Sequence, residues 1–316
     1  MRLKIIFLGT PDFAVSSLKM LVENKYEIVG VVTAPDKYGG RGRKQLIMSD
    51  VKKYALENNL NILQPTNLKN RKFLDELKSL NADLQVIVAF RMLPEVVWDM
   101  PPMGTFNLHG SLLPKYRGAA PIHWAVINGE RETGVTSFKL KHAIDTGDML
   151  LQRRTPIKGY DTLGSVYSKL KTLGAQVVIE SVRMIESGNL RLRPQPDEQV
   201  TKAPKLNRAN CQLDFNKPTH VVYNKIRGLD PFPTAWCSID GKVHKIFKSR
   251  PYTDGVPRKS GNIFTDNKSY LCVSTNNGYI HVHEIQQEGK KKLSISELLN
   301  GYSFKSEAID AMQNLQ

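Results

Sequence analysis

Short runs of consecutive apolar residues alternate with helical patterns through the first half of the chain. The runs cover residues 3–8 (LKIIFL), 27–33 (EIVGVVT), 84–89 (LQVIVA) and 105–108 (TFNL). A strand that is buried on both faces has such a continuous apolar run, and this is typical of parallel sheets. Helical spacing follows at 13–23 and at 50–58, where Ser49 is a suitable N-cap. The alternation therefore predicts an α/β fold in which helices cover a parallel sheet.

The pattern changes after a long helix that we predict at 161–188. Residues 189–205 are polar and interrupted by prolines, which predicts a linker over 190–208. Short strand-like stretches follow between turns rich in glycine and asparagine, at 243–247, 270–273 and 279–285. They favour a small β domain, such as a barrel. For a chain of 316 residues we expect two domains, at 1–189 and 209–316.

The chain is strongly basic, with 45 Lys and Arg against 30 Asp and Glu and a formal net charge of +15. A basic surface attracts polyanions, and nucleic acid is the commonest polyanion in a cell. A lysine-rich protein without such a partner is the alternative. Cys211, Cys237 and Cys272 share no short spacing, which argues against a disulfide framework and a zinc site. The sequence shows neither an apolar run of about 20 residues nor a signal peptide, so we expect the cytoplasm.

An amide and an imidazole lie two residues apart at the end of one predicted strand. Asn107 and His109 project to the same side of an extended segment. In open parallel sheets, ligands bind beyond the carboxyl ends of the strands. The amide donates a hydrogen bond without titrating, and histidine exchanges a proton near neutral pH. Together they can stabilise a carbonyl oxygen that becomes an oxyanion. A histidine that only bonds to the backbone is the alternative.

A second polar stretch, AIDTGDM at 143–149, places Asp145 and Asp148 on either side of a Thr-Gly turn. An aspartate on such a loop can orient a histidine or stabilise its cationic form. The alternative is that both aspartates only build the turn.

Together these stretches resemble the folate-dependent formyltransferases. The resemblance is carried by FNLHGSLLPKYRGAAPIHWAVINGE at 106–130, TGVT at 133–136 and IDTGDML at 144–150. It implies a Rossmann-like formyltransferase domain and catalytic roles for Asn107, His109 and Asp145. It also implies 10-formyltetrahydrofolate as co-substrate, and no metal.

The resemblance implies that two segments contact the folate: Phe90, Arg91, Met92 and Leu93, and Ser111, Leu112, Leu113 and Pro114. Many relatives have Tyr-Gly where this chain has Phe90-Arg91, which leaves contacts from the backbone. Core packing is the alternative for Met92 and Leu93.

Within that family the chain is most similar to the branch that formylates the methionine of initiator tRNA. FLGTPDFAV at 7–15 and TAPDKYGGRGRK at 33–44 carry this similarity, and in that branch the second stretch is a loop that enters the tRNA acceptor stem. The basic β domain is then an OB-like barrel that binds tRNA. The implied partner is initiator methionyl-tRNA, and the expected state is a monomer. The implied contacts are Lys37, Arg41, Arg43, Lys44, Lys205, Arg208, Lys245 and Lys248.

Other functions remain open. Formyltransferases that act on glycinamide ribonucleotide or nucleotide sugars, and hydrolytic relatives, use the same three polar residues but do not explain the basic loop. A non-catalytic RNA-binding protein does not need Asn107, His109 and Asp145. A dinucleotide-dependent oxidoreductase needs a G-x-G-x-x-G turn where the chain has GTPD at 9–12. We place Trp236 in the core of the β domain.

Overall fold

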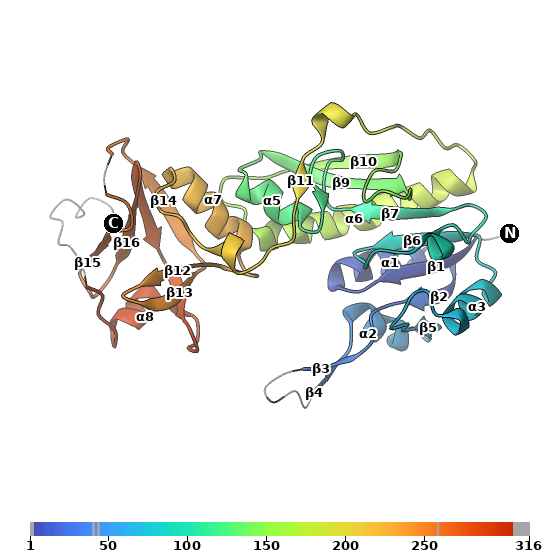
Figure 1. The fold of residues 1–316 in the computed structure, drawn as a ribbon, viewed down its shortest axis with the longest axis horizontal. Coiled ribbons are helices and arrows are strands. Elements are labelled where there is room, and N and C mark those ends of the chain that lie inside the picture. The colour runs from blue at the N-terminus through green and yellow to red at the C-terminus, as the bar shows by residue number, and fades with distance from the viewer. Residues whose placement is uncertain (1–2, 40–41, 43–44, 258, 306–316) are drawn as a thin grey trace. The chain divides into compact units, whose positions relative to one another are not determined.

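The structure is a computed structural model that describes residues 3–39, 42, 45–257 and 259–305. The chain divides into two compact units. The first comprises Met1–Pro121, Thr133–Thr155 and Tyr167–Ala203, and the second comprises Ile122–Glu132, Pro156–Val166 and Pro204–Gln316. Figure 1 labels the helices and strands of both units.

The first unit is built on a seven-stranded sheet in the order β10-β9-β7-β6-β1-β2-β5. Its strands are β1 (Lys4–Gly9), β2 (Glu27–Val32), β5 (Ile62–Leu63), β6 (Leu84–Val88), β7 (Thr105–His109), β9 (Glu132–Lys139) and β10 (Met149–Pro156). The five strands β1, β2, β5, β6 and β7 are parallel, and β9 pairs antiparallel with β7. The four apolar runs form β1, β2, β6 and β7, which confirms the predicted parallel sheet.

Helices lie against this sheet. They are α1 (Asp12–Glu23), α2 (Asp50–Glu57), α3 (Arg71–Ser79), α4 (Glu95–Trp98) and most of α6 (Leu163–Glu186). Ser49 caps α2 as predicted, because its side chain accepts a hydrogen bond from the backbone N–H of Lys52. Among the described residues, no helix is both long enough and apolar enough to cross a membrane.

The packing of α6 decides which way the polar residues of β7 point. Gly174 of α6 lies so close to β7 that an added Cβ would come 2.7 Å from Leu108 Cδ2. Leu108 therefore faces α6. Because side chains alternate along a strand, Asn107 and His109 face the other side of the sheet.

Two pairs of short strands complete the first unit. The hairpin β3 (Lys37–Gly39) and β4 (Gln45–Ile47) occupies the ends of the predicted glycine-rich loop. The second pair, β8 (Arg117–Gly118) and β11 (Lys202–Ala203), is parallel. β11 and the short helix η2 (Asp197–Gln199) lie in the segment predicted as a linker. This segment differs from a free linker, because β11 pairs with β8 and residues up to Ala203 belong to the first unit. The predicted domain boundaries stay a prediction.

The second unit contains two four-stranded sheets, in the orders β12-β13-β18-β19 and β14-β17-β16-β15. Their strands are β12 (Ala235–Ile239), β13 (Lys242–Ile246), β14 (Ser249–Thr253), β15 (Ile263–Thr265), β16 (Leu271–Thr275), β17 (Gly278–Val282), β18 (Glu284–Gln287) and β19 (Leu293–Ser294). These strands pair with one another in antiparallel fashion, which confirms a small β domain after the parallel-sheet domain.

One hydrophobic cluster joins both sheets of the second unit. It includes Cys237 of β12, Ile246 of β13, Val273 of β16 and Ile280 of β17. Helix α7 (Thr219–Leu229), which the sequence patterns did not predict, adds Ile226 to the cluster. The unit also contains η3 (Ala209–Cys211), α8 (Ile295–Leu299) and nearly all of α5 (Pro121–Ile127).

Candidate active site

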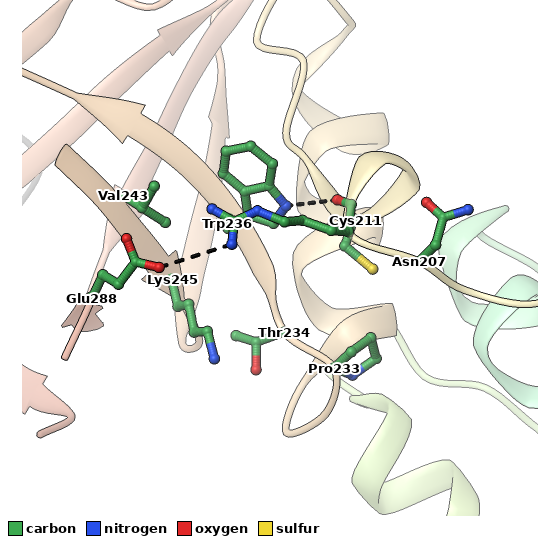
Figure 2. A pocket seen from close by; sticks show the side chains of 9 residues that line it. Asn207, Cys211, Pro233, Thr234, Trp236, Val243, Lys245 and Glu288 are labelled. Atoms are coloured by element: carbon green, nitrogen blue, oxygen red, sulfur yellow. Dashed lines mark hydrogen bonds and ion pairs between the residues drawn. The ribbon is translucent and has the colours of Figure 1, made fainter. Parts of the chain in front are cut away.

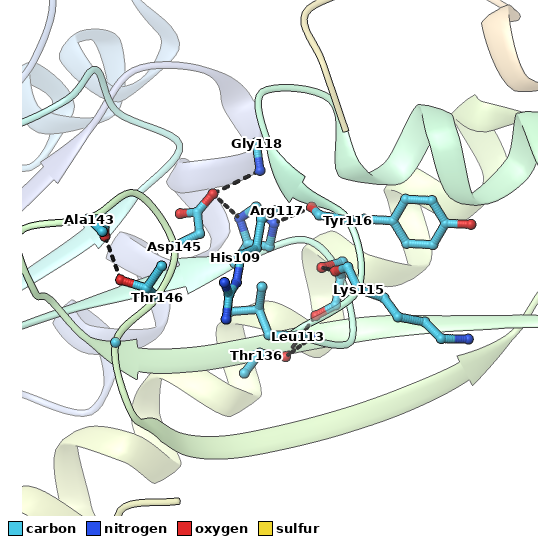
Figure 3. A network of polar contacts seen from close by, with 12 residues as sticks. His109, Leu113, Lys115, Tyr116, Arg117, Gly118, Thr136, Ala143, Asp145 and Thr146 are labelled. Atoms are coloured by element: carbon cyan, nitrogen blue, oxygen red, sulfur yellow. Dashed lines mark hydrogen bonds and ion pairs between the residues drawn. The ribbon is translucent and has the colours of Figure 1, made fainter. Parts of the chain in front are cut away.

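The carboxyl end of β7 brings His109 and Asp145 together (Figure 3). His109 is 6% exposed, and its Nδ1 atom lies 3.8 Å from Asp145 Oδ2. Its Nε2 atom lies 2.9 Å from the carbonyl oxygen of Tyr116. A backbone carbonyl only accepts, so Nε2 carries a proton in this contact. Nδ1 faces the Asp145 carboxylate at ion-pair distance, so the carboxylate and the Tyr116 carbonyl together fix the orientation of the ring.

Asp145 directs its carboxylate away from its own turn. Oδ2 accepts a hydrogen bond from Gly118 N at 2.9 Å, in addition to facing His109. The backbone of Asp145 has a φ of 56°, in the left-handed region that non-glycine residues rarely adopt. Asp148 instead pairs with Lys141 Nζ at 2.9 Å. The two aspartates therefore differ: Asp145 reaches the histidine, and Asp148 stabilises the loop.

Close packing explains the glycine of the Thr-Gly turn. An added Cβ on Gly147 would lie 1.6 Å from the carbonyl oxygen of Lys139. The loop that carries Asp145 can therefore approach the end of β9 only when this position has no side chain.

Asn107 occupies a central position in the sheet. Its backbone lies opposite Ile87 of β6 and Phe138 of β9, so strands flank it on both sides. Its side chain is half-buried and shares a face of β7 with His109. The predicted same-side placement of the amide and the imidazole thus agrees with the register of β7.

Two residues that sequence reasoning missed hold the loop after β7. Thr136 Oγ1 donates to Ser111 O at 2.7 Å and accepts from Leu113 N at 3.1 Å. Gln152 Nε2 donates to Leu113 O at 3.0 Å. The Ser111 hydroxyl donates to Lys115 O at 2.6 Å, so it serves the loop itself. A polar residue within a buried strand is the sequence signal that could have indicated Thr136.

The family is now clear from comparison with known proteins. Residues 2–182 match the family model described as formyl transferase, and residues 205–303 match the model described as formyl transferase, C-terminal domain. The chain belongs to the formyl transferase family.

Curated relatives match almost the whole of this formyl transferase. A protein named methionyl-tRNA formyltransferase from Flavobacterium johnsoniae is 47% identical over 312 residues, which covers 97% of this chain and 98% of the relative. A protein of the same name from Bacteroides fragilis is 48% identical over 320 residues, with coverages of 97% and 98%.

Solved structures share the fold at lower identity. An N-formyltransferase from Helicobacter canadensis, in complex with folinic acid and dTDP-3-aminofucose, aligns with a TM-score of 0.68 at 21% identity and covers 92% of this chain and 100% of that one. HypX from Aquifex aeolicus, in complex with tetrahydrofolic acid, aligns with a TM-score of 0.65 at 20% identity and covers 98% and 49%.

The side chains of the first segment predicted to contact the folate, residues 90–93, differ in their surroundings. The Arg91 guanidinium donates to the carbonyl oxygens of Pro65 and Thr66, which engages its side chain within the first unit. Phe90 packs against the core, and Leu93 is 8% exposed. Met92 is 73% exposed, so core packing applies to Leu93 and not to Met92. In the second segment Ser111, Leu113 and Pro114 are buried, and Leu112 is half-buried.

Among the described residues, one tRNA candidate of the first unit lies on the β3–β4 hairpin. Lys37 is exposed on β3, whereas Arg41, Arg43 and Lys44 lie outside the described residues. An ion pair between Asp36 and Lys52 holds the base of the hairpin. Hydrogen bonds from Lys52 and from Gln64 Nε2, the latter 2.9 Å long, lower the pKa of the Asp36 carboxyl.

The candidates of the second unit do not form one cluster among the described residues. Lys205 and Lys248 are exposed, whereas Arg208 and Lys245 line a pocket of about 270 Å³ (Figure 2). The Arg208 guanidinium lies 5.0 Å from the centroid of the Trp236 ring. It also lies 3.8 Å from a carboxylate oxygen of Glu288.

Trp236 lies at the edge of the core of the second unit. It is half-buried and packs against the core cluster, and it also lines the pocket. Its indole N–H donates to Arg208 O at 2.7 Å. Burial raises the pKa of the Cys211 thiol in the same pocket, which makes it a poor nucleophile.

Proposed function

We propose that this formyl transferase moves the formyl group of 10-formyltetrahydrofolate to the α-amino group of the methionine carried by initiator tRNA. The observation that carries this proposal is the nearly full-length similarity to relatives named methionyl-tRNA formyltransferase. The His109–Asp145 pair at the end of β7 supports the chemistry.

In the proposed reaction, the amine nitrogen bonds to the formyl carbon and the bond from that carbon to N10 of the folate breaks. Negative charge develops on the formyl oxygen, where Asn107 donates a hydrogen bond and His109 acts as imidazolium. Asp145 orients His109 and helps the proton of the attacking nitrogen to reach N10. An α-amino group has a pKa of about 8, so a useful fraction is already neutral at pH 7.

Substrate binding is divided between two kinds of surface. For the folate we propose backbone groups of residues 90–93 and the loop at 111–114, which Thr136 and Gln152 hold in place. For the tRNA we propose Lys37 of β3, the residues Arg41, Arg43 and Lys44 of the basic stretch at 33–44, and the cations Lys205, Arg208, Lys245 and Lys248. Translation initiation in the cytoplasm is the proposed setting.

The net charge of +15 favours a polyanionic acceptor over a small amine. The test offers methionylated initiator tRNA and glycinamide ribonucleotide in parallel, with 10-formyltetrahydrofolate as donor. We expect formyl transfer to the tRNA alone. Transfer to glycinamide ribonucleotide, or release of free formate without transfer, would mean that the acceptor has been assigned wrongly.

A further inference from the structure

We propose that Gln195 is a positioning residue, which holds the loop bearing Asp145 in the conformation that directs its carboxylate to His109. The inference rests on the proposed function, because it gives Gln195 a part in the same formyl transfer. Gln195 lies in the polar, proline-interrupted segment that resembles a linker in sequence.

The amide of Gln195 is fully engaged beside the candidate active site. Gln195 is 9% exposed, although it lies between the exposed Pro194 and the half-buried Pro196. Its Nε2 atom donates to Asp145 O and to Gly147 O, both at 2.8 Å. Its Oε1 atom accepts from Arg117 Nε at 2.9 Å. One buried amide thus connects the Asp145 loop with β8.

This contact matters because Asp145 adopts an unfavourable backbone conformation. A φ of 56° is accessible to aspartate but persists only where surrounding contacts hold it. The carbonyl oxygens of Asp145 and Gly147 both accept hydrogen bonds from one NH₂ group, that of Gln195. Without this donor, two carbonyl groups in a half-buried loop lose their hydrogen bonds, and other loop conformations become competitive.

Other residues of the segment 193–203 contact the groups that bind His109 and Asp145. Thr201 Oγ1 accepts from the backbone N–H of Tyr116 at 2.8 Å, and Tyr116 O is the oxygen that faces His109 Nε2. Ala203 pairs with Gly118, whose N–H binds the Asp145 carboxylate. The segment therefore supports the groups around both ends of the His109–Asp145 contact, and Gln195 is its most direct link to Asp145.

The test compares three variants in steady-state transfer to methionylated initiator tRNA. Q195M preserves side-chain length and removes all three hydrogen bonds. Q195E keeps the acceptor for Arg117 but cannot donate to the two carbonyl groups. Q199M is the matched control, because Gln199 is exposed in the same segment.

We expect Q195M and Q195E to lower kcat about 10- to 100-fold, because small displacements of a catalytic group have effects of this size. KM for both substrates should stay within about twofold, and Q199M should match the wild type. Wild-type activity in either Q195M or Q195E, or an equal rise in KM, would overturn the inference. Q195E keeps the test valid where Q195M fails to fold.

A double-mutant cycle separates positioning from a purely structural role. If Gln195 acts through the Asp145 carboxylate, Q195M should cost less than about threefold in a D145N background. The same 10- to 100-fold loss in that background would overturn the inference. Absence of transfer to tRNA by the wild type would instead contradict the proposed function itself.

Discussion

The two units hold their candidate functional residues in opposite ways. In the first unit His109 and Gln195 are 6% and 9% exposed, and their polar contacts are with backbone groups and with the side chains of Asp145 and Arg117. In the second unit the side chains of Arg208 and Glu288 are 68% and 64% exposed although they pair with each other. Buried groups whose hydrogen bonds are all made depend on exact positions. Exposed cations attract a ligand by long-range electrostatics, which salt screens. We therefore expect that a few substitutions in the first unit have large, coupled effects on formyl transfer. In the second unit we expect that many substitutions each have a small effect on tRNA affinity.

The largest effect should come from H109A, with N107A and D145A in the same class. Each removes a group that stabilises charge or moves a proton in the transition state, so transfer should fall about 10³-fold or more. Single-turnover kinetics measure the loss, and tRNA binding is measured separately. H220A is the control, because His220 is exposed on α7. Parallel loss of tRNA affinity in the three variants would contradict the catalytic assignment.

G147A should have the next largest effect. The new methyl group would come 1.6 Å from Lys139 O, so the Asp145 loop must shift. We expect destabilisation of about 1–3 kcal/mol in denaturant unfolding and at least a tenfold lower kcat. G159A serves as control, because nothing lies within 4 Å of a Cβ at that glycine. Equal stability and activity of the two variants would mean that the loop tolerates displacement.

R208A and K245A should have smaller, salt-dependent effects. Each should weaken tRNA affinity about threefold at moderate salt and reduce the slope of log affinity against log salt by about 1. We expect kcat to stay unchanged. K72A, in the exposed face of α3, is the control. A loss of kcat, or a loss of affinity that is independent of salt, would break the distinction between the two units.

The smallest effect concerns Asp266, at a turn of the second unit. Desolvation alone raises its pKa, but hydrogen bonds from Ser269 and the backbone N–H groups of 268–270 outweigh it and hold the pKa well below 3.8. A lowered folded-state pKa contributes stability above pH 3.8, and this stability is lost as the pH falls towards the folded-state value.

D266N should therefore lower stability at pH 7 by less than about 1 kcal/mol, since the group is exposed. The difference from the wild type should shrink as the pH falls below 3.8. Melting curves across the pH range, with D75N as an exposed control, check this. A difference that grows in acid would contradict the assignment.

Local patterns predicted much of the fold and part of the candidate site. The apolar runs predicted β1, β2, β6 and β7, and Ser49 was predicted as the cap of α2. The spacing of Asn107 and His109 placed both on one face of a strand. The apolar runs, the N-cap and the spacing within a strand depend on residues that are neighbours in the chain, so they can be predicted from one sequence. Gln195, Thr136 and Gln152 carry no such local signal, because their partners lie 16 to 78 residues away.

The sequence by itself determined the parallel sheet, the basic character and the polar residues at the end of β7, because strand burial and charge are properties of short stretches. Tertiary structure alone decided that Asp145, and not Asp148, reaches His109. It also placed Trp236 at the edge of the core, where it lines a pocket, and brought a linker-like segment onto the candidate site through Gln195. The physical reason is that a hydrogen bond between distant residues depends on where the whole chain places them.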